Sequence, residues 1–191
     1  MPLASTALSF DGHAIISADG MIADAEGLIP DALRVEADFK RFQAALDDAV
    51  LVVMGREGHK KHPNPGRRRL VFTAQVAALE PDPSDSHAYF YNPDGLSLAA
   101  MLAELGLTSG TVAVTGGTRV FDFFLPYYDR FLLSEVRTFT LPTGRPAFSG
   151  GHPRFVLAGA GFSPTDMETI APGVVSTLWV KGRPAGLAGV C

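Results

Sequence analysis

Short apolar segments alternate with helix-like segments along most of this chain, and this alternation limits the possible folds more than any other feature. Three segments have apolar residues at helical spacing: Val35–Leu46, Leu96–Leu105 and Arg119–Leu125. Eight others, rich in valine, isoleucine, leucine and phenylalanine, read as strands. These are His13–Ala18, Val50–Gly55, Arg69–Thr73, Ala88–Tyr91, Thr111–Thr115, Arg130–Val136, Phe155–Gly161 and Val174–Val180. Such alternation predicts a parallel sheet with helical crossovers.

The segments after Arg130 lack helical patterns between them and are punctuated by glycine and proline. This part of the chain therefore predicts an antiparallel hairpin at the C-terminal end. The expected fold class is α/β, with a mixed, mostly parallel sheet of about eight strands flanked by helices. A chain of 191 residues with 47% hydrophobic content suits a single domain over residues 1–191. The connection Asp19–Arg34 is long for a compact domain, and loops of this length are typically functional lids or disordered segments.

Charge and composition exclude several classes of protein. The net charge is −4, and the one dense basic run is Arg67–Arg69, so we expect no binding to nucleic acid. Residues 1–10 do not resemble a signal peptide and no window is apolar enough for a membrane span, which indicates a cytoplasmic protein. The single cysteine, Cys191, cannot form an internal disulfide. His59 and His62 lack further ligands at metal-binding spacing, so we expect no metal. The chain is expected to be a monomer or a homodimer.

Two adjacent glycines, Gly116 and Gly117, follow an apolar strand and precede a helix. Glycines at this position let the backbone approach a pyrophosphate, and a helix N-terminus favours an anion. A tight turn that needs glycine explains the pair equally well. Gly55 and Arg56 end another predicted strand, where a guanidinium could bind a phosphate, and Thr73 ends a third. Together these three strand ends predict a dinucleotide site.

Five short motifs resemble, in their order and spacing, the dihydrofolate reductase family and the related reductase domain of riboflavin biosynthesis. They are Ile16–Ala23, Asp38–Gln43, Val53–Arg56, Pro65–Val71 and Thr115–Gly117 with Leu125–Pro126. The resemblance implies a dihydrofolate reductase-like fold and an oxidoreductase that uses NADPH. It also implies a small heterocyclic substrate such as dihydrofolate or another dihydropterin, for example dihydromethanopterin, and a role in one-carbon metabolism.

The resemblance also implies which residues form the site. Asp38 matches the catalytic acid of the family, Arg67 matches the arginine that holds the carboxylate tail of folate, and Ser134 matches a hydroxyl that supports the acid. The remaining substrate-binding residues are Ala14, Ile15, Phe39 and Phe42. The cofactor-binding residues are Ile22, Gly55, Arg56, Glu57, Gly58, Thr73, Ala74, Thr115, Gly116, Gly117, Thr118, Arg119 and Val120.

The chemistry suits Asp38 because a carboxylate offers two acceptor oxygens to the paired N–H groups of an amino-pyrimidine. Asp38 and Phe42 are four residues apart and share one helix face. The residues alone also allow Asp38 to complement the helix dipole and the phenylalanines to be core.

Three features depart from the folate enzymes. Pro30 is followed by Asp31 where those enzymes carry tryptophan, Glu57–His59 stand where they show Thr-Trp, and Ser17–Ala23 looks closer to the riboflavin-type reductases. A ribosylamino-pyrimidine on the riboflavin route therefore stays open as the substrate. A binding protein that keeps the fold without turnover is a third possibility.

Overall fold

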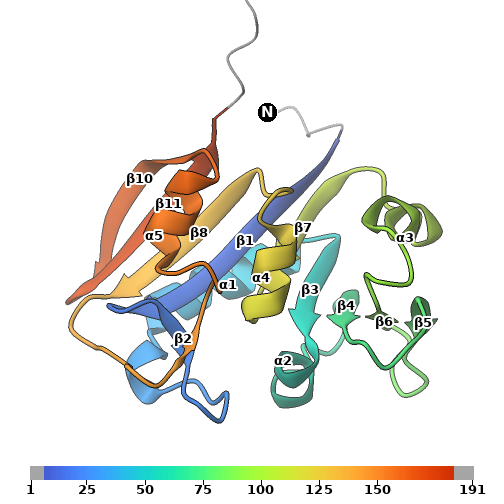
Figure 1. The fold of residues 1–191 in the computed structure, drawn as a ribbon, viewed down its shortest axis with the longest axis horizontal. Coiled ribbons are helices and arrows are strands. Elements are labelled where there is room, and N and C mark those ends of the chain that lie inside the picture. The colour runs from blue at the N-terminus through green and yellow to red at the C-terminus, as the bar shows by residue number, and fades with distance from the viewer. Residues whose placement is uncertain (1–6, 183–191) are drawn as a thin grey trace, which may run out of the picture.

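The computed structural model describes residues 7–182, and nine of the strands in this range form one sheet (Figure 1). The sheet order is β10-β11-β8-β1-β7-β3-β4-β6-β5. Its strands are β1 (Leu8–Ser17), β3 (Leu51–Gly55), β4 (Arg69–Phe72), β5 (Leu79–Pro81), β6 (Ala88–Tyr91), β7 (Gly110–Val114), β8 (Arg130–Val136), β10 (Phe162–Ala171) and β11 (Val174–Lys181). A separate ribbon pairs β2 (Met21–Ala23) with β9 (Arg145–Pro146).

Six neighbouring strands of the sheet are parallel: β8, β1, β7, β3, β4 and β6. Their carboxyl ends therefore meet at one edge, where ligands bind in open α/β sheets. The strands β11 and β10 continue the sheet beyond β8 as an antiparallel hairpin, and β5 closes the opposite side. The central strand β3 reads Leu-Val-Val-Met-Gly and is buried from Leu51 to Met54, as expected for a strand covered on both faces.

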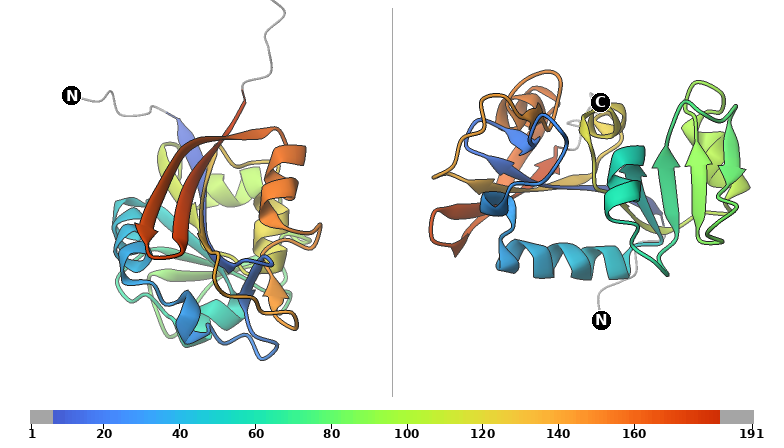
Figure 2. Two further views of the ribbon diagram at one scale, coloured as in Figure 1. Left: turned by 90° about the vertical axis from the view of Figure 1, so that its left-hand side faces the viewer. Right: turned by 90° about the horizontal axis from the view of Figure 1, so that it is seen from below.

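Helices cover both faces of the sheet (Figure 2). The longest helix, α1 (Glu36–Asp48), packs Leu46 and Phe42 against one face. The opposite face packs against α3 (Leu98–Glu104), α4 (Thr118–Phe124) and α5 (Pro153–Gly159), and it carries the larger core. Two short helices, α2 (Arg56–Lys61) and η1 (Asp31–Leu33), follow β3 and precede α1, respectively.

The expected fold class is confirmed, including the mostly parallel sheet and the C-terminal antiparallel hairpin. One predicted strand is wrong, because Phe155–Gly161 lies within and just beyond helix α5. Pro153 occupies the first turn of this helix, and the side chain of His152 accepts a hydrogen bond from the backbone N–H of Arg154. Both features start a helix, and they outweigh the apolar composition of the segment.

The sequence patterns did not predict β10 and α2. Seven consecutive residues of β10 are exposed, so this edge strand has no alternation of apolar and polar residues. The helix α2 has no buried residue and therefore no apolar stripe. The long connection Asp19–Arg34 contains β2 and η1, and is thus partly ordered. Within residues 7–182, no helix has the length and hydropathy to cross a membrane, and Cys191 lies outside this range.

Candidate active site

A cleft of about 1400 Å³ opens at the edge where the parallel strands end. Pockets for one small molecule hold roughly 300–1,000 Å³, so this cleft has room for two ligands side by side. Its walls are formed by β1, by the ribbon that contains β2, by the N-terminal part of α1, by α2 and by the first turns of α4. Almost all the residues that the sequence and the resemblance predicted for the site line this cleft; Arg67 and Ser134 do not.

The two glycines lie between β7 and α4 and differ in what surrounds them. Gly116 has φ +90°, and a Cβ atom there would overlap the ring of Phe121, so the fold itself requires glycine. A Cβ atom on Gly117 would meet nothing closer than Cδ1 of Ile22 at 3.9 Å. The peptide between the two glycines is cis. The turn explanation thus holds for Gly116, whereas Gly117 presents open backbone to the cleft.

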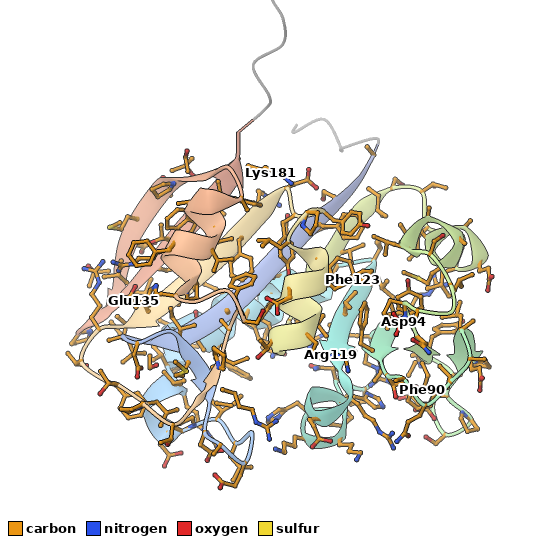
Figure 3. The ribbon with its side chains drawn as sticks, in the orientation of Figure 1. Phe90, Asp94, Arg119, Phe123, Glu135 and Lys181 are labelled. Carbon is orange, nitrogen blue, oxygen red and sulfur yellow. The ribbon has the colours of Figure 1, made fainter. Side chains whose placement is uncertain are left out.

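Two arginines in the cleft wall have no partner among the described residues. Arg56 begins α2 and Arg119 lies in α4; neither guanidinium makes a hydrogen bond or an ion pair within residues 7–182. Figure 3 labels Arg119 and Phe123 on α4, and both line the cleft together with Asp94, which follows β6. Unpaired guanidinium groups in a concave site can bind phosphate oxygens through two parallel hydrogen bonds.

The predicted threonines use their side chains within the fold. The hydroxyl of Thr115 donates to the carbonyl of Val53 at 3.1 Å, and that of Thr118 donates to the carbonyl of Pro146 at 2.5 Å. Thr73 accepts a hydrogen bond from the backbone N–H of Gln75 at 3.2 Å. These hydroxyls hold the strand ends in place around the cleft.

Asp38 lies in the first turn of α1 with its carboxylate toward the cleft. The side chain is partly buried, forms no ion pair with a described residue and receives no hydrogen bond from the described backbone. Burial raises the pKa of Asp38 above its ordinary value of 3.8, and the Ser134 hydroxyl and the Arg41 guanidinium oppose this rise. Ser134 is buried on β8, close enough to Asp38 for its hydroxyl to lower the pKa of that carboxyl, although the two groups lack the full geometry of a hydrogen bond.

Aromatic and aliphatic side chains flank Asp38. Phe42 lies one helical turn farther along α1 and meets the ring of His13 at 6.1 Å between centroids. Phe39 is 58% exposed, which is unusual for a phenylalanine, and lines the cleft mouth. Ala14 and Ile15 of β1 complete this end of the cleft. An unpaired carboxylate beside apolar walls is suited to a flat, polar-edged heterocycle.

Arg67 requires a correction, because its guanidinium is not free to hold a carboxylate tail. It forms an ion pair with Asp47 at 2.6 Å and donates to Gln43 at 2.9 Å and to Asn64 at 2.8 Å. The side chain does not line the cleft. Asp47 and Gln43 lie on α1. Gln43 falls within the predicted helix Val35–Leu46 and Asp47 directly follows it, but the sequence did not identify either residue as a partner of Arg67.

A loop over the cleft is held by two basic side chains that sequence reasoning missed. The Lys61 ammonium donates to the carbonyls of Glu26 and Gly27 at 3.2 and 2.7 Å. The Arg145 guanidinium donates to the carbonyl of Ala25 at 3.0 Å. Lys61 is 35 residues from Glu26 and Arg145 is 120 residues from Ala25, so no local pattern could have indicated these contacts.

Solved structures share this architecture. A protein named for riboflavin biosynthesis from Shewanella sp. PV-4 superposes with a TM-score of 0.67 and 17% identity, over 92% of this chain and 99% of that one. Dihydrofolate reductase from Enterococcus faecalis, complexed with NADP(H) and RAB-propyl, gives a TM-score of 0.65 and 18% identity, over 95% and 100%. The chain has the dihydrofolate reductase fold.

A third protein with the dihydrofolate reductase fold extends beyond the region shared with this chain. It is the diaminohydroxyphosphoribosylaminopyrimidine deaminase/5-amino-6-(5-phosphoribosylamino)uracil reductase from Thermotoga maritima, with a TM-score of 0.65 and 18% identity. The match covers 92% of this chain and 57% of that protein. No family model and no curated protein sequence matches the chain.

Proposed function

We propose that this protein is an NADPH-dependent reductase that reduces a C=N bond of a dihydropteridine-type heterocycle. The observation that carries the proposal is Asp38, a partly buried carboxylate without an ion-pair partner among the described residues, at the end of a cleft large enough for two ligands. Such a group can bind the paired N–H donors of an amino-pyrimidine edge. A reductase with the dihydrofolate reductase fold is the enzyme class that this arrangement favours.

The residues around Gly117 fit a nicotinamide dinucleotide. Gly117 leaves space for a ligand against the backbone, and the Arg56 and Arg119 guanidinium groups are unpaired in the same cleft. When bound, the dinucleotide supplies the hydride. Two available arginines favour NADPH over NADH, because the additional phosphate of NADPH needs a cationic partner.

The raised pKa suits Asp38 to proton transfer. The ionised carboxylate accepts hydrogen bonds from the ring, and a carboxyl group whose pKa is raised by burial can also hold a proton and pass it to the ring, which then accepts a hydride more easily. The apolar walls of Phe39 and Phe42 hold the ring flat against β1 and limit the access of water. Because Arg67 is paired with Asp47, we favour a dihydropterin whose tail does not depend on this arginine.

A ribosylamino-pyrimidine of the riboflavin route is the second candidate substrate. The similarity to the Shewanella protein, which spans nearly all of that chain, favours this alternative. It would use the same cleft and the same acid, since both substrates carry an amino-pyrimidine ring. An assay that follows NADPH oxidation with each substrate class separates the two.

The variant Asp38→Asn tests the proposal. The amide cannot take up the proton, and it has an NH2 donor in place of the second acceptor oxygen, so we expect kcat/KM with a dihydropterin to fall at least about 100-fold. NADPH affinity, measured by fluorescence titration, is expected to stay unchanged because Asp38 lies at the substrate end. Asp48→Asn, an exposed carboxylate on the same helix, is the matched control. Unchanged turnover in Asp38→Asn would contradict the role of this residue. If the wild-type protein binds no NADPH, the reductase proposal is wrong, and a binding protein without turnover becomes the favoured interpretation.

A further inference from the structure

The imidazole of His13 lies in the cleft wall on β1 without a hydrogen-bond partner. Its Nδ1 is closed off from solvent and unpaired, and no described residue bonds to Nε2. Buried polar groups nearly always find a partner in a folded protein. The Nε2 atom is not closed off in this way and is therefore the nitrogen open to a ligand.

Empty space borders His13 on two sides. The main cleft and a second cavity of about 310 Å³, beneath the C-terminal half of α1, both have His13 and Leu132 in their walls. Leu132 is the register partner of His13 on β8, and the ring of Phe42 meets the imidazole edge-on. A side chain that serves only to fill the core would be surrounded by protein, so packing does not account for histidine here.

The charged neighbours of His13 do not satisfy its nitrogens. Asp11 lies two residues before His13 on β1, and Arg130 lies two residues before Leu132 on β8. These two side chains form an ion pair with each other. Burial lowers the pKa of His13, Asp11 opposes this change and Arg130 adds to it. The imidazole is therefore neutral at neutral pH, with one nitrogen as donor and the other as acceptor.

We infer that His13 is a substrate-binding residue whose Nε2 forms a hydrogen bond with a polar group of the bound heterocycle. The inference rests on the proposed function and narrows its substrate class. Asp38 binds one edge of the ring, and Phe42, one helical turn farther along α1, covers the face of the ring. His13 lies beside Phe42. The substrate accordingly carries a second hydrogen-bonding group, an oxo group or a ring nitrogen, at the position that faces His13. A hydrocarbon edge at this position would leave His13 unpaired.

Three substitutions at His13 test this assignment with 2-amino-4-oxopteridine and NADPH as separate ligands. His13→Leu removes the nitrogens, and we expect the Kd for the pteridine to rise about tenfold. The amide of His13→Gln reaches about as far as Nε2, so we expect the Kd for the pteridine to stay within about threefold of the wild-type value. The side chain in His13→Asn is shorter, and we expect its Kd to rise by more than this. The Kd for NADPH should stay unchanged in all three. The Tm of His13→Leu should be equal or higher, because an unpaired polar group is replaced by an apolar one.

Asp38→Asn, measured in parallel, separates failure of this inference from failure of the proposed function. Loss of pteridine binding in Asp38→Asn but not in His13→Leu would overturn the assignment of His13 and leave the proposed function standing. A lower Tm in His13→Leu, with equal losses of pteridine and NADPH affinity, would show a structural role and also overturn it. Wild-type protein without affinity for the pteridine would overturn both.

Discussion

Two aspartates of the same chain show how strongly the surroundings of a residue set its chemistry. Asp19 follows β1 and accepts hydrogen bonds from the Ser17 hydroxyl at 2.5 Å and from the backbone N–H of Leu141 at 2.8 Å. Burial alone would raise the pKa of Asp19, but these hydrogen bonds outweigh it and lower the pKa. For Asp38 burial outweighs the opposing effects of the Ser134 hydroxyl and the Arg41 guanidinium, and the pKa of Asp38 is raised. Asp19 is therefore a structural anion, and Asp38 is the group available for a ligand.

The sequence indicated Asp38 only through the motif around it. Its spacing to Phe42 predicted a shared helix face, and the structure places both in the cleft wall. His13 could not be recognised in this way, because a single histidine in an apolar strand is typical of a packed side chain. What distinguishes it is the lack of a partner and the adjoining space, which depend on β8 and α1.

Arg56 permits a prediction at the same scale. Its guanidinium is unpaired in the cleft, so Arg56→Ala should not affect folding, but it should weaken NADPH binding by about tenfold or more through the loss of charged hydrogen bonds. Fluorescence titration measures the affinity, and Lys60→Ala, an exposed base on the same helix, is the control. An unaltered Kd for NADPH in Arg56→Ala would exclude Arg56 from the cofactor site.

Among the elements, those with an internal apolar pattern were predicted best. The helix α1 and the parallel strands carry that pattern in their own residues, and the structure contains them close to the expected bounds, except that β1 begins five residues earlier, at Leu8 and not at His13. The helix α5 depends on a helix cap, and the edge strand β10 depends on its pairing with the following strand β11. Contacts such as those of Lys61 and Arg145 with the loop at residues 25–27 arise only when the chain has folded.

The turn from β7 into α4 separates a structural glycine from a binding glycine. Gly116→Ala should destabilise the protein by about 1–3 kcal/mol, because alanine is strained at φ +90° and its Cβ would overlap Phe121. The Phe121 ring cannot retreat, since it packs against Phe131 and Phe148 at 5.5 and 5.7 Å. Thermal unfolding of the unliganded protein measures this effect.

Gly117→Ala is the matched comparison for that turn. Its new methyl group would point into open space, so the Tm should stay within a degree or two of the wild-type value while NADPH affinity falls. Equal losses of stability in both variants would refute this division of roles between the two glycines.

At the scale of the whole molecule, carboxylates with lowered pKa values hold both neighbouring and distant parts of the chain in place. Asp19 connects the end of β1 to Leu141, and Asp85 binds His87 and the buried Arg69. Hydrogen bonds from the backbone of His87 and from Arg69 lower the pKa of Asp85, as those from Ser84 lower the pKa of Asp82. The apolar periodicity of the strands predicted the parallel sheet, but it contained no information about these connections.

The lowered pKa values predict how stability depends on pH. A carboxylate whose folded pKa lies below its unfolded value of 3.8 contributes stability above 3.8 that is lost as the pH falls through the folded pKa. The free energy of unfolding, from urea titrations at several pH values, should therefore decline below about pH 4. In Asp19→Asn the protein should be less stable at neutral pH, and its decline in acid should be shallower. A parallel shift of the curve at all pH values would contradict this origin.

The free side of β10 also affects how the molecule behaves at high concentration. An edge strand offers unpaired N–H and C=O groups to any other strand, and seven consecutive residues of β10 are exposed. Pro164 removes one donor from this strand, and its pairing with β11 shifts register after Pro164 and again after Thr169. These interruptions leave no long, regular row of backbone groups, so intermolecular strand addition along this edge, and the amyloid-like aggregation that can follow from it, is disfavoured.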